Sequence, residues 1–166
     1  STDETWKIVG EFIGRHPELA ARCVDEDRQG PSFARNCGAK LAKGDIIAFI
    51  DADCVADASW LHRLSESFGN SNIGAVAGSI IGFDRQTLIG KFHSLFTMRR
   101  LPESRMFHEF KLVSGGFPTA NLAIRRTAFE EIGGFSEDMP FFAEDYDLCA
   151  RVYSKGYPIY YNGEAI

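Results

Sequence analysis

The apolar residues of this chain form two kinds of pattern: helical spacing, typical of amphipathic helices, and continuous runs, typical of buried strands. Near its beginning, four apolar side chains recur at helical spacing and predict a helix: Trp6, Val9, Phe12 and Ile13. Thr2 or Asp3 can cap this helix. The pair His16-Pro17 ends it, because a residue before proline disfavours helical geometry.

Further helical patterns and continuous apolar runs divide the rest of the chain into alternating strands and helices. Strands are predicted over 21–24, 46–50, 75–83, 119–124 and 157–161. Helices are predicted over 32–42, 60–68, 86–100, 125–132 and 145–155. Ser32 is the expected cap of the first of these helices, and Gly44 its stop signal. Strands that alternate with helices predict an α/β sheet with helices on its faces.

The run from Ile46 to Ile50 is apolar throughout, which predicts a strand buried on both faces. The polar residues 51–57 then lie beyond its carboxyl end, where open α/β sheets bind their ligands. Asp51-Ala52-Asp53 begins this loop, and two carboxylates in an extended turn can converge on one hard cation. A solvated acidic loop is the alternative that this pattern alone leaves open.

Two other kinds of site also use closely spaced aspartates. An EF-hand loop needs a third ligand two residues on and then glycine, and Val55 and Ala56 exclude it. A haloacid-dehalogenase-type phosphatase uses a motif that resembles residues 51–55, with the first aspartate as nucleophile. Its later motifs would fall at Ser114, at Lys111 or Arg125, and at Glu144-Asp145.

Composition places the chain among ordinary globular domains and narrows its partners. Its 166 residues, 45% hydrophobic and 25% charged, suffice for one domain with a sizeable core. A formal net charge of -5 gives no reason to expect nucleic acid. No apolar run reaches the ~18 residues of a membrane span, and the start lacks the apolar core of a signal peptide. The cysteines lack Cys-x-x-Cys spacing and indicate reduced thiols in a cytosolic-type compartment: Cys23, Cys37, Cys54 and Cys149.

Short motifs follow one another in a definite order. The first half contains Ala34-Arg35-Asn36-Cys37-Gly38, then Ala42-Lys43-Gly44-Asp45, then the apolar strand and Asp51-Ala52-Asp53. The second half contains Thr119-Ala120-Asn121, then Ile132-Gly133-Gly134-Phe135, then Glu144-Asp145-Tyr146-Asp147. Together these motifs resemble the family 2 glycosyltransferases over essentially the whole chain. The phosphatase is the weaker alternative, because it places its aspartate motif on its first strand and does not predict the glycine pair.

The resemblance implies the GT-A fold, a Rossmann-like mixed sheet flanked by helices. In that family a strand-helix-strand unit precedes a turn that Ser1-Thr2-Asp3 would end. We therefore expect residues 1–166 to form a single partial catalytic domain that lacks this unit and the C-terminal end.

The resemblance also implies a nucleotide-sugar donor and a divalent cation, Mn²⁺ or Mg²⁺, that offsets the charge of the leaving diphosphate. Asp53 is the expected metal ligand, and Asp51 is expected to bind the donor's ribose or the metal through water. Arg35 and Asn36 are expected near the nucleotide, with helix packing as the alternative for Asn36. UDP-, GDP- and dTDP-sugars all remain open as donors.

An acceptor hydroxyl needs a base as it attacks. The resemblance assigns that role to Asp145, with Glu144 holding the acceptor or orienting Asp145. Capping of the helix is the alternative for both residues. A base without a protein nucleophile implies single displacement and inversion at the anomeric carbon. Asp147 and Arg151, four residues apart, are expected to form an ordinary helix ion pair.

The acceptor side is expected at the Gly133-Gly134-Phe135 turn. Phe135 would stack on a sugar face or pack in the core. The acceptor itself would be a glycan or a lipid-linked molecule. A competing function is a non-catalytic domain that binds a nucleotide sugar or glycan, and the acidic residues at 51, 53, 144 and 145 argue against it.

A basic amphipathic stretch between 91 and 111 adds one further expectation. A domain helix with an apolar inner face and a solvated outer face explains it best. Peripheral contact with an anionic membrane is the alternative. The expected location is the cytoplasm, including the cytoplasmic face of a membrane.

Overall fold

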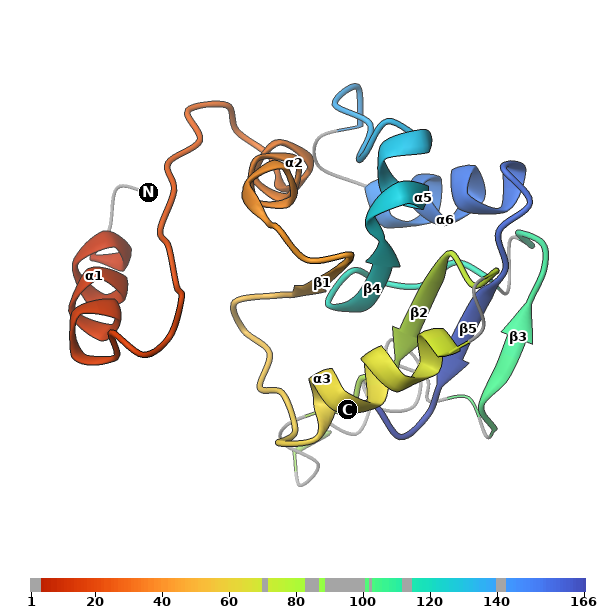
Figure 1. Ribbon diagram of the computed structural model, residues 1–166, viewed down its shortest axis with the longest axis horizontal. Helices are drawn as coiled ribbons and strands as arrows, with labels where there is room; N and C mark the ends of the chain where they lie inside the picture. Colours follow the sequence, from red (N-terminus) through yellow and green to blue (C-terminus); the bar gives the residue numbers. More distant parts are fainter. Residues whose placement is uncertain are drawn as a thin grey trace.

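A mixed β-sheet forms the centre of the molecule (Figure 1). The computed structural model describes residues 4–69, 72–82, 87–88, 101, 103–111, 115–139 and 143–166. In these residues the strand order is β1-β4-β2-β5-β3. The strands are β1 (Ile46–Ile50), β2 (Ala75–Gly78), β3 (Arg105–Phe107), β4 (Asn121–Arg125) and β5 (Ile159–Asn162). β2 and β5 are parallel, and the other neighbouring pairs are antiparallel.

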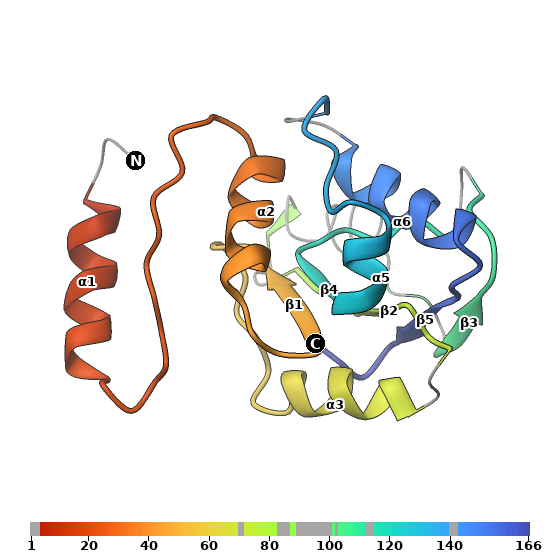
Figure 2. The same cartoon turned by 45° about the horizontal axis from the view of Figure 1, so that its top comes forward.

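Helices cover both faces of this sheet, as the alternation of predicted elements indicated. One face carries α2 (Pro31–Leu41), α5 (Arg126–Glu131) and α6 (Glu144–Ser154). The other carries α3 (Trp60–Glu66) and the 3₁₀ turn η1 (Ser67–Gly69) (Figure 2). Alternate residues of β1 serve the two layers: Ile47 and Phe49 belong to the core under α5 and α6, whereas Ile46 packs toward Trp60. This two-sided core fixes the ends of the strands, where the acidic residues lie.

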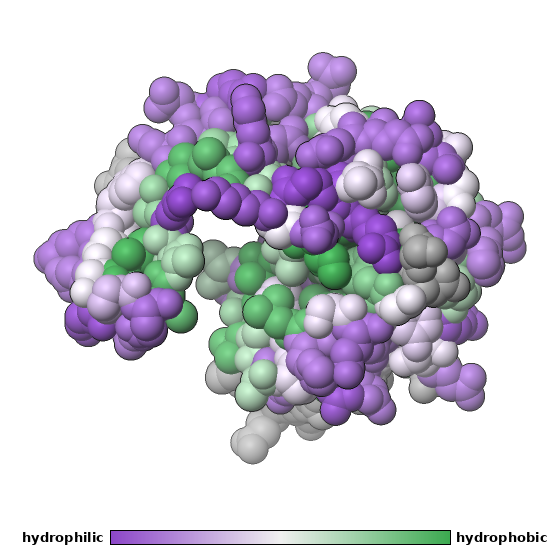
Figure 3. Space-filling view, in the orientation of Figure 1, coloured by the Kyte–Doolittle hydropathy of each residue, from purple (hydrophilic) through white to green (hydrophobic). Residues whose placement is uncertain are grey.

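The first helix, α1 (Thr5–Arg15), stands apart from the sheet (Figure 1). It has no buried residue, and Trp6, Ile8 and Phe12 are exposed. Apolar surface on α1 borders an open gap between this helix and the rest of the molecule (Figure 3). The helix ends before His16, as expected, but residues 21–24 form no strand and run as an extended connection. That strand prediction is wrong because no neighbouring strand pairs with this stretch in the described residues.

Two expectations about β1 and α2 also need correction. β1 is fully buried on one face only, through Ile47 and Phe49. On its other face Ile46 and Ala48 are partly buried and Ile50 is exposed. Ser32 does not cap α2, which begins at Pro31, a residue suited to the first helical position. The buried hydroxyl of Ser32 instead donates to the carbonyl of Met139 (3.1 Å).

Several predicted features fall outside the residues that the structure describes. The predicted caps Thr2 and Asp3 and nearly all of the 86–100 helix lie outside them. Within the basic stretch, residues 105–107 form the strand β3, which the pattern did not predict. Among the helices that the structure describes, none combines the length and the apolar character needed to cross a membrane.

Candidate active site

Arg35 joins the two acidic segments that the sequence singles out. Its Nη1 donates to Oε1 of Glu144 at 2.7 Å, and its Nη2 donates to Oδ1 of Asp51 at 2.9 Å. The three residues come from α2, from the loop after β1 and from the first turn of α6. The structure therefore brings residues 51 and 144, distant in sequence, to opposite sides of one guanidinium group.

Burial makes this bridge energetically important. The side chains of Arg35 and Glu144 are only 17% and 11% exposed. A carboxylate buried to that extent is costly unless a cation and hydrogen bonds compensate it. Glu144 and Asp145 also occupy the first turn of α6, where the helix dipole favours negative charge. Arg35 and the start of α6 together allow several carboxylates to lie close to one another.

Asp145 lies beside this bridge and is partly buried. Burial raises the pKa of its carboxyl above the usual range, and the negative charge of Glu144 adds to that effect. The backbone N–H of Tyr146 donates to Asp145 Oδ1 at 2.8 Å, and this bond and the charge of Arg35 lower the pKa in part. A carboxyl with a raised pKa is a better proton acceptor, so the environment of Asp145 suits a general base.

The loop after β1 presents a second acidic surface. Asp53 is exposed, and Asp51 is 40% exposed on the side that Arg35 does not cover. Burial raises the pKa of the Cys54 thiol, and the nearby charges of Asp53 and Asp51 raise it further. Cys54 therefore lies close to both carboxylates of this loop.

The donor set of this loop fits a hard divalent cation only in part. Two carboxylates are suitable oxygen ligands. No group of three or more potential metal-ligating side chains occurs among the residues that the structure describes. Mg²⁺-type sites commonly combine one or two protein carboxylates with water and substrate phosphates, and that arrangement matches Asp51 and Asp53.

Asn36 has a packing role instead of the predicted donor contact. Its Nδ2 donates to the carbonyl of Phe135 at 3.0 Å, and its Oδ1 accepts from the N–H of Phe135 at 2.8 Å. Both polar groups of the Asn36 amide are bonded to the main chain of Phe135, so Asn36 links the 133–139 segment to α2. The packing alternative left open for Asn36 is the one that the structure supports.

Phe135 is likewise a core residue, so core packing is the one of its two open alternatives that the structure supports. The side chain is 2% exposed, and its ring meets Phe49 and Phe129 at centroid distances of 5.2 and 5.7 Å. The guanidinium of Arg35 lies 5.6 Å from the ring centroid. Gly134 is also buried, with φ at 74°. The Phe135 ring therefore packs near the Arg35 guanidinium, and because it is buried it is not available to stack on a ligand.

The turn at 132–134 depends on a residue whose role the sequence did not reveal. Arg151 forms the expected ion pair with Asp147 at 2.6 Å. It also donates to the carbonyls of Ile132 and Gly134 at 2.7 and 2.6 Å. Helical spacing predicted the ion pair, but only the fold shows that α6 holds this turn in place.

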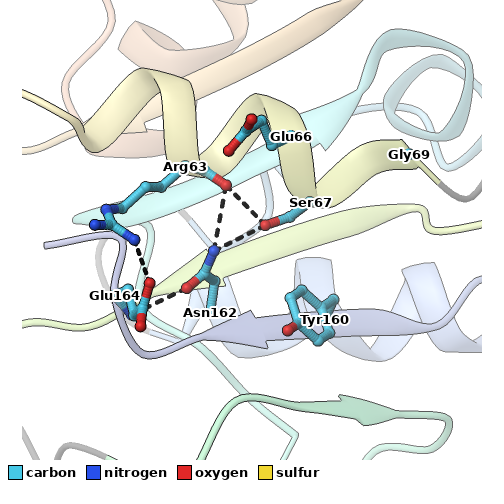
Figure 4. Close-up of a pocket in the computed structure, with 7 residues that line it drawn as sticks. All are labelled: Arg63, Glu66, Ser67, Gly69, Tyr160, Asn162 and Glu164. Carbon is cyan, nitrogen blue, oxygen red and sulfur yellow. Dashed lines mark hydrogen bonds and ion pairs between the residues drawn. The ribbon is translucent and has the colours of Figure 1, made fainter.

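A separate polar pocket lies beside α3, on the sheet face opposite α6 (Figure 4). Its volume is about 370 Å³, and its lining includes Arg63, Ser67, Tyr160 and Asn162. Asn162 Nδ2 donates to Ser67 Oγ at 2.9 Å and to the Arg63 carbonyl at 3.3 Å. None of these residues belongs to the predicted site, and the pocket is distinct from the acidic surface around Arg35.

Comparison with known proteins gives matches over most of the chain. Residues 1–133 match the family model described as glycosyl transferase family 2. Among curated relatives, the glucosyl-dolichyl phosphate glucuronosyltransferase of Haloferax volcanii is 27% identical over 98% of this chain. The match covers 54% of that relative, so the chain spans about half its length.

Solved structures agree on the architecture. A mannosyltransferase from Pyrobaculum calidifontis, in complex with GDP-Man and Mn²⁺, has a TM-score of 0.74 and 23% identity over 99% of this chain and 44% of its own. S. aureus TarS 1-349, in complex with UDP, has a TM-score of 0.70 and 18% identity over 99% of this chain and 46% of its own. These overlaps confirm the expected GT-A fold, a mixed sheet flanked by helices.

Proposed function

The chain belongs to glycosyl transferase family 2, and from this we propose that it carries much of the site at which a sugar passes from a nucleotide-diphosphate donor to an acceptor hydroxyl. The observation that carries the proposal is the Arg35 bridge between Asp51 and Glu144. It brings one acidic segment suited to a cation beside another suited to proton transfer, which is the combination that the reaction needs.

Asp53 and Asp51 would hold Mn²⁺ or Mg²⁺ together with the donor's phosphates. When bound, the cation would supply a Lewis acid that offsets the charge of the departing nucleoside diphosphate. The exposed carboxylate of Asp53, with the partly exposed carboxylate of Asp51 in the same loop, supports this assignment. So does the mannosyltransferase neighbour, whose complex contains GDP-Man and Mn²⁺.

Asp145 would act as the base. Its carboxylate takes the proton from the acceptor hydroxyl while the acceptor oxygen bonds to the anomeric carbon and the bond from that carbon to the diphosphate breaks. Attack from the face opposite the leaving group inverts the anomeric centre. Glu144, paired with Arg35, would orient the base, and its negative charge adds to the raised pKa of Asp145.

The donor and the acceptor are proposed as chemical classes. The structural neighbours contain GDP-Man and UDP, which supports a nucleotide sugar with a UDP, GDP or dTDP carrier. A glycan or lipid-linked hydroxyl is the proposed acceptor, and the relative from Haloferax volcanii carries a dolichyl phosphate in its name. The four cysteines are free thiols, which supports action in the cytoplasm or at the cytoplasmic face of a membrane.

Sugar transfer by the full-length gene product in Mn²⁺ tests this proposal. Asp53→Ala and Asp145→Asn are expected to reduce transfer at least 100-fold, and Asp25→Asn, a change at an exposed loop position, is expected to leave it unchanged. Asp145→Asn should still bind the donor. Full activity in both site variants contradicts the proposal, and donor binding without turnover in the wild type would favour the non-catalytic alternative.

A further inference from the structure

Asn121 lies beside both ends of the acidic loop, residues 51–59. The loop begins after Ile50, the last residue of β1, which is the register partner of Asn121 in β4. It ends at Trp60, the first residue of α3, whose indole Nε1–H donates to Asn121 Oδ1 at 2.8 Å. Asn121 is thus beside the residue where the loop starts and bonded to the residue where it finishes.

The other end of the same amide is also fully used. Asn121 Nδ2 donates to the carbonyl of Ser79 at 3.0 Å and to the carbonyl of Ala165 at 2.9 Å. The side chain is only 5% exposed. The Asn121 amide therefore links three parts of the chain: α3, the residue after β2 and the residues after β5.

The backbone around Asn121 leaves room for its amide and also forms a hydrogen bond with the acidic loop. A Cβ atom at Gly78 would collide with both Nδ2 and Oδ1 of Asn121, so only glycine fits there. The Ala165 carbonyl also accepts from the N–H of Ser79 at 2.8 Å. The next carbonyl, that of Ile166, accepts from the N–H of Asp57 in the acidic loop at 2.8 Å.

We propose that Asn121 is a positioning residue for the cation site, acting through Trp60 and the 163–166 segment to fix the loop that carries Asp51 and Asp53. This role rests on the proposed function of those two carboxylates. Between its ends the loop exposes Asp53 and Val55, so the spacing of the carboxylates depends on how firmly the ends are held. A loop freed at one end must be ordered again when a cation binds, which weakens binding.

The experiment removes the two partners of the hydrogen bond between Asn121 and Trp60. Asn121→Ala removes the amide, and Trp60→Phe removes the indole donor and part of the ring while keeping an aromatic side chain. Tyr157→Phe is the control, because it also removes a donor and keeps a ring, and its hydroxyl donates to Glu131 and not to the acidic loop or the 163–166 segment. Two quantities are measured on the full-length gene product: Mn²⁺ affinity from the EPR signal of free Mn²⁺, and amide hydrogen exchange of residues 51–60 without metal.

Asn121→Ala and Trp60→Phe are expected to weaken Mn²⁺ binding by about 10-fold, the lower end of the effect of residues that orient metal ligands. Both should also accelerate hydrogen exchange in residues 51–60, and Tyr157→Phe should change neither quantity. Wild-type affinity in both Asn121→Ala and Trp60→Phe overturns the proposal, as does an equal loss in Tyr157→Phe. Trp60→Phe carries the test alone if Asn121→Ala does not fold.

The failure of this role can be told apart from the failure of the cation site. Asp53→Ala is included in the same titration. If Asp53→Ala loses Mn²⁺ binding while Asn121→Ala and Trp60→Phe keep it, the cation site stands and the positioning role of Asn121 falls. If Asp53→Ala binds Mn²⁺ as the wild type does, the proposed cation site falls and the role of Asn121 falls with it.

Discussion

At the scale of single residues, the chemistry around α2 depends on pairs of groups that the sequence does not reveal. Arg35 was expected to face the nucleotide, yet both ends of its guanidinium are held by Glu144 and Asp51. A motif such as Ala34-Arg35-Asn36 indicates which residues lie near a site. It does not state their partners, because those come from α6 and from the loop after β1.

The Arg35 bridge leads to a prediction for stability. Arg35→Met leaves the buried carboxylate of Glu144 without its cation, so the free energy of unfolding is expected to fall by about 3 kcal/mol. Urea denaturation measures it. Arg22→Met, at an exposed position, should change stability by less than ~0.5 kcal/mol. An additional Glu144→Gln should restore part of the loss, and a bridge of no structural importance would show no difference between the two arginine variants.

Asp145 leads to a prediction for pH dependence. Its pKa is raised in the folded state, so the native protein holds this proton more tightly than the unfolded chain. The group therefore favours folding while protonated, and this contribution is lost as pH rises through the folded pKa. Asp145→Asn keeps an oxygen for the Tyr146 N–H and removes the charge, so it should melt at a higher temperature than the wild type at pH 7. Thermal melts should show this gain shrinking toward pH 4, and a lower melting temperature at pH 7 would refute the assigned cause.

At the scale of elements, the periodicity of apolar residues predicted most of the sheet and its helices. β1, β4, β5, α2, α3 and α6 all occur close to their expected bounds. The strand predicted at 21–24 failed because no neighbouring strand pairs with it in the described residues, and Ile50 is exposed although it ends an apolar run. Local sequence carries the tendency to form a strand, whereas pairing and coverage depend on distant segments.

The turn between α5 and α6 gives a prediction at this scale. Gly134 has φ at 74°, and a Cβ there would lie 2.7 Å from Asn36 Oδ1. Gly134→Ala is therefore expected to cost about 1–3 kcal/mol of stability through strain and displacement of Asn36. Gly38→Ala is the control, since Gly38 lies in α2 with nothing within 4 Å of such a Cβ. It should stabilise by about 0.5–1 kcal/mol, and equal effects of both changes in denaturation experiments would contradict this account.

At the scale of the whole molecule, the fold does what no single motif predicts: it places the ends of separate elements around one guanidinium. The two carboxylate segments and α2 meet where β1 ends and α6 begins. Residue types and their order sufficed to indicate the family and the acidic residues. The burial of Phe135, the occupied amide of Asn36 and the role of Asn121 arise from contacts between distant segments, which residue spacing does not encode.

The central claim is that the two acidic segments meet at one site, with the cation held by Asp51 and Asp53, and paramagnetic broadening by Mn²⁺ tests it most directly. In NMR spectra of the full-length gene product, Mn²⁺ should broaden the backbone amides of 51–54 and, with them, those of 144–147 and of Arg35. The far end of α6 lies about 15 Å from its start and should be affected less. Asp53→Ala should abolish the pattern. Broadening confined to 51–54, with 144–147 unaffected, would contradict the account.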